Sequence, residues 1–211
     1  MKKLTIFIPV YNQEVLILRA LKSIPKRDDI NVLIIDDCST DRTLQACQEW
    51  KQKNPDMEIQ IKALKENKGL GYVKNIAYKE ATGEYIHELD ADDYLNTKEY
   101  EKVIEQLDGT DMVYCNLIVN DNSVFKLTPE TQKNYCSGIA RFIRKEFIGN
   151  TKCPELRATQ DLYFNQKLQR KKHTDKFTDI DAYFYNFPRE GSLYDQYKKG
   201  KIKVEVDPND L

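Results

Sequence analysis

The feature that most constrains this chain is a regular alternation of short apolar runs and helix-like segments over residues 1–110. The strand-like runs lie at 4–10, 32–35, 59–63 and 85–89, and each is followed by apolar residues at helical spacing. Such alternation favours an α/β fold, with a mostly parallel sheet flanked by helices. Within 59–63, apolar and polar residues alternate, which predicts a half-exposed strand near the edge of the sheet.

The pattern changes after residue 110. We predict strands at 112–119, 124–127 and 183–187, and helices at 139–147 and 159–168. In the preceding part, Asn96 is a predicted helix N-cap, with Glu99 as its capping-box partner. The chain has no internal repeat and no dividing linker, so we expect a single domain over 1–195, with halves at 1–110 and 111–195. A Lys-rich tail at 196–211 completes the chain.

Charge and cysteine content narrow the classes of function. The formal net charge of −1 gives no general attraction to nucleic acid or anionic lipid. Five cysteines without a CxxC pair, and only two histidines, argue against a zinc site. No apolar run approaches the ~20 residues of a membrane span, and the strand-like start predicts no signal peptide. We therefore expect a cytoplasmic protein with reduced thiols.

Acidic side chains follow two predicted strands at the point where each strand ends. They are Asp36 and Asp37 after 32–35, and Asp90, Asp92 and Asp93 after 85–89. Because ligands of open parallel sheets bind outside the carboxyl ends of the strands, we expect these carboxylates to gather at one edge. Two charges ~4 Å apart repel by about 4 kcal/mol at an effective dielectric of ~20. A cation, a donor-rich ligand or protonation must relieve that repulsion, and oxygen ligands suit Mg²⁺ or Mn²⁺. Capping of helices and turns is the alternative role, above all for Asp93.

A glycine-containing turn lies between the two acidic groups. It reads Asn67-Lys68-Gly69-Leu70-Gly71 and leads into a predicted helix that contains Lys74. Glycines before a helix allow a phosphate to approach the backbone, and Lys74 adds a positive charge. The turn is neither a GxGxxG fingerprint after the first strand nor a GxxxxGK[ST] loop. These absences argue against a dinucleotide dehydrogenase and a P-loop ATPase.

Taken in order, these motifs resemble the family 2 glycosyltransferases, which have the GT-A fold. The resemblance rests on Ile8-Pro9-Val10-Tyr11-Asn12, Asp36-Asp37-Cys38-Ser39-Thr40-Asp41, Asn67-Lys68-Gly69, Gly83-Glu84-Tyr85-Ile86 and Asp90-Ala91-Asp92-Asp93. It continues more loosely through 141–147, 160–164 and 183–192, so it runs from about residue 3 to residue 195. It implies a Rossmann-like, nucleotide-sugar-binding half at 1–110 and a smaller half at 111–195 for the acceptor and the catalytic base.

The resemblance also implies the role of each site residue. The nucleotide base, commonly uracil, would be held around Pro9, Tyr11, Glu14 and Asp37, and Asn67 and Lys74 would contact the donor. Asp90-Ala91-Asp92 would be the DxD motif, in which Asp92 ligates Mg²⁺ or Mn²⁺ and Asp90 supports the ribose or the metal shell. Asp161 would be the general base of an inverting transfer, which needs one group to take the acceptor proton.

For a second set of side chains, the sequence allows either a functional or a structural role. Arg189 and Ser192 would belong to a loop over the donor diphosphate, or to an exposed turn. Arg141 and Arg144 would line the acceptor side, or a solvated helix face. His87 lies inside a strand run, which favours a core histidine over a catalytic one, and packing is favoured over sugar stacking for the tyrosines at 183 and 185.

Two departures from the family pattern concern this site. Gln160 stands before the presumed base where the family usually has Glu, which removes a charge beside Asp161 and would weaken it as a base. Lys74 stands where the family often has Arg, and lysine lacks the bidentate fork of arginine. A donor contact made by Lys74 would therefore be weaker or different.

Other functions remain open at this point. A catalytically weakened nucleotide-sugar-binding module would keep the pocket without turnover. A sugar nucleotidyltransferase would need a Gly-rich, Arg-containing loop where this chain has Pro9-Val10-Tyr11-Asn12-Gln13. The motifs do not encode the acceptor, which could be a saccharide, a lipid-linked saccharide, a cell-wall polymer, a protein or a modified nucleic acid. The basic cluster at 167–176 would meet an anionic acceptor or a membrane surface, or be a solvated face. The small second half suggests that a homo-oligomeric partner or a bulky acceptor completes the site.

Overall fold

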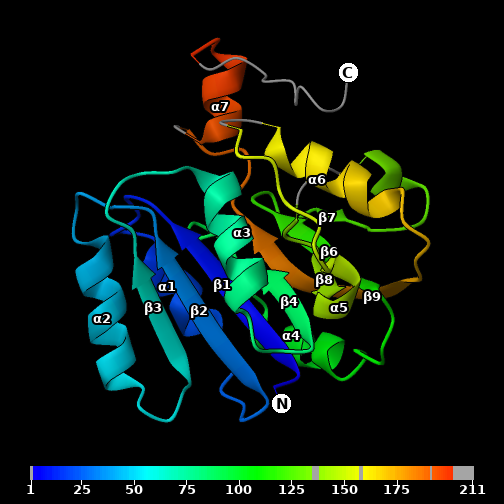
Figure 1. Cartoon of the computed structure of the whole chain (residues 1–211), viewed down its shortest axis with the longest axis horizontal. Helices are drawn as coiled ribbons and strands as arrows, with labels where there is room; N and C mark the ends of the chain where they lie inside the picture. The colour runs from blue at the N-terminus through cyan, green and yellow to red at the C-terminus, as the bar shows by residue number, and fades with distance from the viewer. Residues whose placement is uncertain (1, 135–137, 157–158, 191, 202–211) are drawn as a thin grey trace.

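The computed structural model describes residues 2–134, 138–156, 159–190 and 192–201. A single sheet connects the strands in the order β3-β2-β1-β4-β8-β6-β9-β5, with β7 paired to β6 (Figure 1). The strands are β1 (Leu4–Val10), β2 (Ile30–Asp36), β3 (Ile59–Ala63), β4 (Tyr85–Glu88), β5 (Tyr94–Leu95), β6 (Met112–Val119), β7 (Val124–Phe125), β8 (Arg141–Arg144) and β9 (Asp175–Tyr185). The α-helices are α1 (Ile17–Ser23), α2 (Thr43–Lys53), α3 (Leu70–Glu80), α4 (Thr97–Ile104), α5 (Lys145–Ile148), α6 (Gln160–Gln169) and α7 (Leu193–Lys198), and a 3-10 helix covers Thr131–Asn134.

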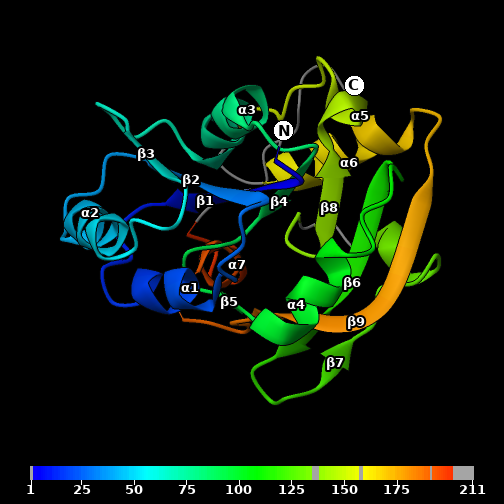
Figure 2. The same ribbon diagram turned by 90° about the horizontal axis from the view of Figure 1, so that it is seen from below.

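The first four strands form the predicted parallel half of the sheet. β1 pairs in parallel with both β2 and β4, and β2 pairs in parallel with β3 at the sheet edge. Every residue of β2 is buried, as expected for a strand covered on both faces. Figure 2 shows α3 on one face of this half and α1 on the other. The carboxyl ends of β1, β2 and β4 therefore open at the same edge.

The second half of the sheet is mixed rather than parallel. β8 lies antiparallel between β4 and β6, whereas β9 pairs in parallel with β6 and antiparallel with β5. The α/β class is confirmed, but the predicted helix at 139–147 is wrong: this segment forms β8 and the single turn of α5. Its buried apolar side chains fit helical spacing, yet pairing with strands on both sides determines the structure.

The last strand is longer than the predicted run at 183–187. β9 extends over 11 residues, and its first part is mostly polar and half-exposed, so an apolar-run criterion misses it. The register to β6 shifts beside Asn116, and Asp179 has a φ of 52° there. Helix α7 runs across the boundary expected at residue 195, and residues 202–211 of the predicted tail lie outside the described residues.

Helix α4 begins where predicted, but its capping box does not form. The Asn96 side chain makes no cap hydrogen bond, and its amide donates instead to the carbonyl of Asp181, at 3.4 Å. Glu99 accepts a hydrogen bond from Lys102. The Thr97 hydroxyl donates to the carbonyl of Ser23 at 2.8 Å, so the start of the helix is anchored to the end of α1.

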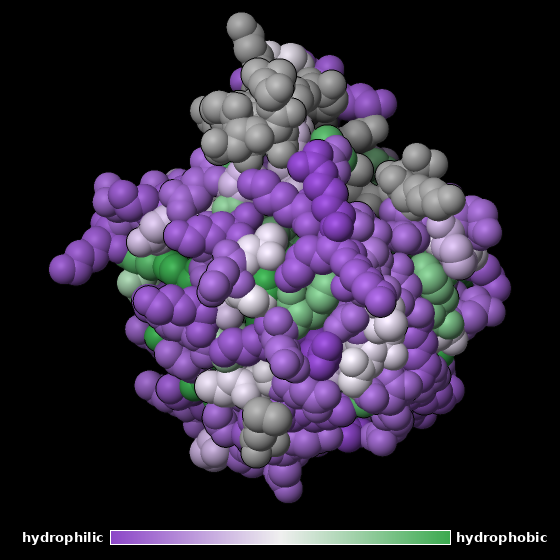
Figure 3. Space-filling model, turned by 45° about the vertical axis from the view of Figure 1, so that its right-hand side comes forward, coloured by the Kyte–Doolittle hydropathy of each residue, from purple (hydrophilic) through white to green (hydrophobic). Residues whose placement is uncertain are grey.

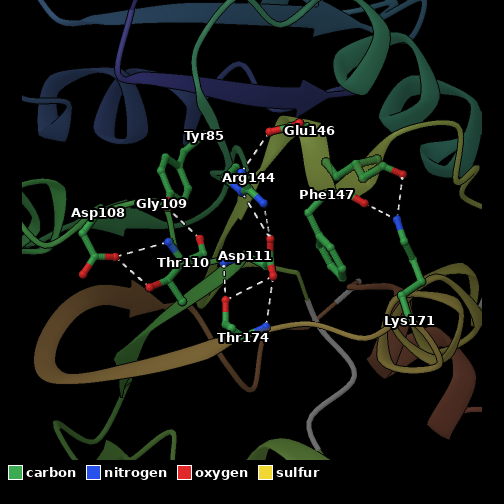
Figure 4. A network of polar contacts seen from close by, with 11 residues as sticks. Tyr85, Asp108, Gly109, Thr110, Asp111, Arg144, Glu146, Phe147, Lys171 and Thr174 are labelled. Atoms are coloured by element: carbon green, nitrogen blue, oxygen red, sulfur yellow. Dashed lines mark hydrogen bonds and ion pairs between the residues drawn. The ribbon is translucent and has the colours of Figure 1, made fainter.

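A polar network fixes the strands of the second half to one another (Figure 4). Arg144 pairs with Asp111 at 2.6 Å and with Glu146 at 2.9 Å. Asp111 also accepts hydrogen bonds from the backbone N–H and the hydroxyl of Thr174, at 3.0 and 3.1 Å. Arg144 therefore joins the starts of β6 and β9 to β8 and does not lie on a solvated helix face. Arg141 is 4% exposed and donates to Asn165 on α6, so it also has a structural contact.

Two lysines of the basic cluster at 167–176 make contacts within the fold. Lys171 donates to the carbonyl of Phe147 and lies 4.4 Å from the centre of its ring (Figure 4). Lys176 pairs with Asp108 at 2.9 Å and donates to the carbonyl of Gln106. These two lysines connect α6 and β9 to neighbouring elements, which leaves a smaller basic surface than the sequence predicts.

His87 is a core residue, as predicted. Its side chain is 0% exposed and stacks on Phe142, with ring centres 4.1 Å apart. Nε2 lies 2.7 Å from the carbonyl of Ile139, which can only accept, and Nδ1 accepts from the Tyr100 hydroxyl at 2.8 Å. The ring is neutral near pH 7, because burial lowers the pKa of His87 to about 3.

This buried ring makes a pH-dependent contribution to stability. The unfolded chain takes up a proton on His87 below pH ~6.5, whereas the folded chain does so only near pH 3, so stability is lost as the pH falls between these values. We expect the unfolding free energy of the wild type, relative to His87→Gln, to fall by about 1.4 kcal/mol per pH unit in this window. Urea unfolding of both proteins between pH 7 and pH 4 measures the difference. Parallel pH curves would contradict the assignment.

Candidate active site

A pocket of about 640 Å³ opens at the carboxyl ends of β1, β2 and β4. Among the residues predicted for the donor site, its lining contains Pro9, Tyr11, Asp37, Asn67, Asp90, Ala91, Asp92, Arg189 and Ser192. It also contains Gly69 of the glycine turn and Tyr185, for which the sequence favoured packing. The lining residues without a role in the sequence analysis are Val10, Asn12, Gln13, Leu70, Val73, Asn186, Phe187 and Gln196. Three predicted residues, Glu14, Lys74 and Asp161, do not line it. Two acidic motifs and the glycine turn therefore meet at one edge of the sheet.

Asp37 ties the end of β2 to the glycine turn. Its carboxylate accepts hydrogen bonds from the backbone N–H groups of Lys68 and Gly69, at 2.7 and 2.8 Å. The Asn67 side chain donates back to the carbonyl of Asp37 at 3.0 Å. Gly69 has a φ of 82°, a conformation that favours glycine. Asp37 and Asn67 thus hold the turn beside the pocket.

The loop after β1 is fixed by side chains that cap the following segments. Asn12, at a φ of 49°, accepts a hydrogen bond from the backbone N–H of Thr40 at 2.8 Å. Glu14 accepts from the backbone N–H of Arg42 at 2.9 Å and is exposed, so it supports the start of α2 instead of lining the pocket. Tyr11 lines the pocket and is 45% exposed. Its ring is therefore available to a ligand.

Asp90, Asp92 and Asp93 offer carboxylate oxygens that lie within 4.8 Å of one another. Asp93 has a structural role: it is 1% exposed and accepts from the Tyr183 hydroxyl at 2.7 Å and from the backbone N–H of Asn186 at 2.8 Å. Burial, together with the charge of Asp92, raises the pKa of Asp93 to about 7. Burial also raises the pKa of Asp90 well above its ordinary value, and the nearby carboxylates add to this. This crowding of carboxylates is the repulsion predicted from the sequence, and a bound cation would relieve it.

The chemistry of these donors fits a divalent cation. Both oxygens of Asp93 already accept hydrogen bonds, and one oxygen of Asp92 is ion-paired with Arg189. Asp90 and the second oxygen of Asp92 are therefore the donors of this group with capacity left for a metal. Hard cations such as Mg²⁺ and Mn²⁺ prefer a few carboxylate oxygens together with phosphate oxygens. The oxygen-only group at the pocket wall matches that preference.

Two arginines meet Asp92. Nε of Arg189 lies 2.6 Å from an Asp92 carboxylate oxygen, which brings the segment after β9 against the DxD motif. Arg19 donates to the carbonyl of Asp92 at 2.6 Å and lies over the ring of Tyr94, 4.6 Å from its centre. Sequence analysis missed Arg19, because an exposed arginine on an amphipathic helix carries no motif. Its contacts hold the backbone of the acidic loop.

Asp161 and Lys74 form an ion pair outside the pocket lining. Asp161 is in the first turn of α6, and its side chain is 25% exposed. Lys74 is 1% exposed, and its ammonium contacts both Asp161 and Glu88, the latter at 2.8 Å. The structure therefore corrects the expectation that Lys74 points to the donor, because two carboxylates from other elements hold it in the interior. Gln160 is buried as well, at 4% exposure.

A mixed sheet with an acidic pocket at the carboxyl ends of its strands is typical of glycosyltransferases with the GT-A fold. The chain belongs to glycosyl transferase family 2. The sequence model of that family matches residues 5–187. The resemblance expected as far as residue 195 thus extends past the matched region, which ends before Arg189.

Among characterised relatives, the chain is similar to poly(ribitol-phosphate) beta-N-acetylglucosaminyltransferase TarS of Staphylococcus aureus. The two are 29% identical over 90% of this chain and 36% of TarS. It is also 29% identical to the teichoic acid poly(glycerol phosphate) polymerase of Staphylococcus epidermidis, over 94% of this chain and 30% of that protein. The chain thus spans about a third of the length of these relatives.

Solved structures share the fold. The crystal structure of S. aureus TarS 1–349 in complex with UDP-GlcNAc has a TM-score of 0.78 at 24% identity, covering 99% of this chain and 63% of that one. The mannosyltransferase PcManGT from Pyrobaculum calidifontis, in complex with GDP-Man and Mn²⁺, has a TM-score of 0.71 at 20% identity, covering 98% and 66%. These likenesses confirm the GT-A-type fold.

Figure 3 shows a face covered mainly by hydrophilic side chains, with apolar atoms in small separate patches. Within the described ranges, none of the helices has both the length and the apolar character needed to cross a bilayer.

Proposed function

We propose that this chain is a glycosyltransferase domain that moves a sugar from a UDP-sugar to an acceptor hydroxyl, with inversion and with help from a divalent cation. The observation that carries the proposal is the pocket in which the acidic loop, the glycine turn and Arg189 meet at the carboxyl edge of the sheet. TarS, a relative named for N-acetylglucosamine transfer, has the same fold in complex with UDP-GlcNAc. UDP is therefore the first nucleotide to test.

Three groups of residues in the pocket would bind the base, the diphosphate and the cation of the donor complex. The base would lie against Pro9 and Tyr11, beside the turn that Asp37 holds. The diphosphate would lie near Asp92 and Arg189, where a guanidinium is available to phosphate oxygens. Asp90 and Asp92 would hold the cation, which, when bound, neutralises charge on the departing diphosphate.

Asp161 would act as the general base. In a single displacement, the acceptor oxygen forms a bond to the anomeric carbon while the bond from that carbon to the diphosphate breaks. The electron pair of the broken bond leaves with UDP, and the acceptor proton goes to Asp161. Because the acceptor oxygen attacks the anomeric carbon from the face opposite the departing diphosphate, the configuration inverts. Gln160, buried beside Asp161, leaves the base itself in place.

The relatives also suggest an acceptor class. Poly(ribitol phosphate) and poly(glycerol phosphate) appear in the names of the two relatives above. We therefore place a polyol-phosphate polymer of the cell wall first among the candidate acceptors.

Thermal melting tests the donor site directly. We expect UDP with Mn²⁺ to raise the melting temperature by roughly 5–10 °C, because a ligand at ~100 times its dissociation constant adds about 2.7 kcal/mol. GDP, CDP and TDP, each with and without Mn²⁺, are the controls. A larger shift with another nucleotide would replace UDP in the proposal. No shift with any of them would contradict a nucleotide-sugar site.

A further inference from the structure

An ion cluster behind the pocket joins three elements of the fold. Lys74 comes from α3, Glu88 from the end of β4, and Asp161 from the first turn of α6. Lys74 and Glu88 are 1% and 4% exposed, whereas the side chain of Asp161 is 25% exposed. The cluster thus presents a single partly open carboxylate, supported from behind by a buried ammonium.

The surroundings of Lys74 leave its ammonium little freedom. A Cβ added at Gly138 would come within 2.5 Å of a Glu88 carboxylate oxygen and 3.8 Å of Nζ of Lys74, so the backbone closes over the pair. One turn before Lys74, a Cβ on Gly71 would lie 2.1 Å from the carbonyl of Pro154. Such close packing holds the α3 face against its neighbours.

The far end of the same helix face packs on α6. The ring of Tyr78, one turn after Lys74, stacks on Phe164 with centres 4.9 Å apart and planes inclined by 13°. Phe164 lies one turn after Asp161. Apolar packing therefore also joins α3 to α6, beside the ion pair between Lys74 and Asp161.

The charges of the cluster keep Lys74 an ammonium. Burial alone would lower the pKa of Lys74, but the charges of Asp161 and Glu88 raise it well above its ordinary value. Burial raises the pKa of Glu88 to about 7, and the charge of Lys74 opposes this rise. When both carboxylates are ionised, the three groups carry a net charge of −1. When Asp161 takes up a proton, the remaining Lys74–Glu88 pair is neutral, so a bare charge is not left in the interior.

We propose that Lys74 is a positioning residue for the transfer: its ammonium holds one oxygen of the Asp161 carboxylate, so that the other oxygen faces the acceptor hydroxyl, while Glu88 holds the ammonium and balances its charge. This inference rests on the proposed function, in which Asp161 is the base. It assigns Lys74 to the acceptor side of the reaction, consistent with its absence from the pocket lining.

The test compares Lys74→Met with the charge-balanced double variant K74M/E88Q. In K74M, the buried Glu88 and the partly exposed Asp161 both lose their cation, so poor folding would also lower the activity. The double variant removes the buried charges of Lys74 and Glu88 together, and only the partly exposed Asp161 carboxylate loses its partner, so the protein is expected to fold. If Lys74 positions Asp161, K74M/E88Q keeps the wild-type melting shift with the nucleotide and Mn²⁺ and the wild-type KM for the donor. Its kcat falls about 100-fold, the size expected for a misplaced reacting group.

Controls separate this inference from the function on which it rests. Lys79→Met makes the same change at an exposed position of α3 and should leave kcat unchanged. Lys74→Arg keeps the charge and should recover part of the lost kcat. Wild-type kcat in K74M/E88Q would show that Lys74 only neutralises Glu88, and would overturn the positioning role alone. A wild type that binds no nucleotide or turns over no donor would overturn both proposals.

Discussion

Asp161→Asn is expected to lower kcat by about 10²- to 10⁴-fold, the contribution typical of a general base. The amide has nearly the shape of the carboxylate but cannot take the acceptor proton. Because Asp161 does not line the pocket, donor affinity and the melting shift with nucleotide and Mn²⁺ should stay at wild-type values. Release of UDP from the donor in the presence of acceptor measures the turnover.

The matched control is Asp56→Asn, which changes an exposed carboxylate paired with Lys26 at 3.3 Å. It should leave kcat unchanged. An Asp161→Asn protein with wild-type kcat would show that another group takes the proton. A wild type that binds donor but never turns it over would instead favour the non-catalytic binding module.

Asp92→Asn is expected to abolish the effect of Mn²⁺ on nucleotide binding. Asp92 and Asp90 are the acidic-loop carboxylates with capacity left for a metal, and an amide is a weaker ligand for a hard cation. The part of the melting shift that depends on Mn²⁺ should disappear, and turnover should fall with it. Without ligand, the variant should melt near the wild-type temperature, since only the partly exposed pair with Arg189 is lost.

Titration of Mn²⁺ into both proteins in the presence of UDP provides an independent measurement. Equal Mn²⁺ affinity in the wild type and in Asp92→Asn would remove Asp92 from the metal site. The same titration with Asp56→Asn should match the wild type.

The first half of the fold could be predicted because its signals are local. Each strand of β1 to β4 is a short apolar run, and a parallel sheet brings the ends of such strands to one edge. Asp37 and Asp92 could therefore be placed in one pocket from their positions after strands.

The second half could not be predicted as well because its signals are tertiary. β8 has helical spacing but becomes a strand between β4 and β6, and the polar start of β9 is a strand only through its pairing with β6. The prediction that Lys74 contacts the donor was wrong for a related reason. A lysine in a helix after a glycine turn suggests a phosphate contact, and the sequence does not show that Glu88 and Asp161 converge on it.

The route of β9 has a consequence for synthesis of the chain on the ribosome. This strand pairs with β5. The Asp93 carboxylate accepts hydrogen bonds from the Tyr183 hydroxyl of β9 and from the N–H of Asn186, which follows β9 directly. A nascent chain that has emerged only as far as residue 170 therefore contains the whole acidic loop, but its Asp93 lacks both of these donors. Such long-range pairing forms late. The donor pocket is thus completed only after nearly all of the described chain has been made, and an incomplete chain does not contain a finished donor site.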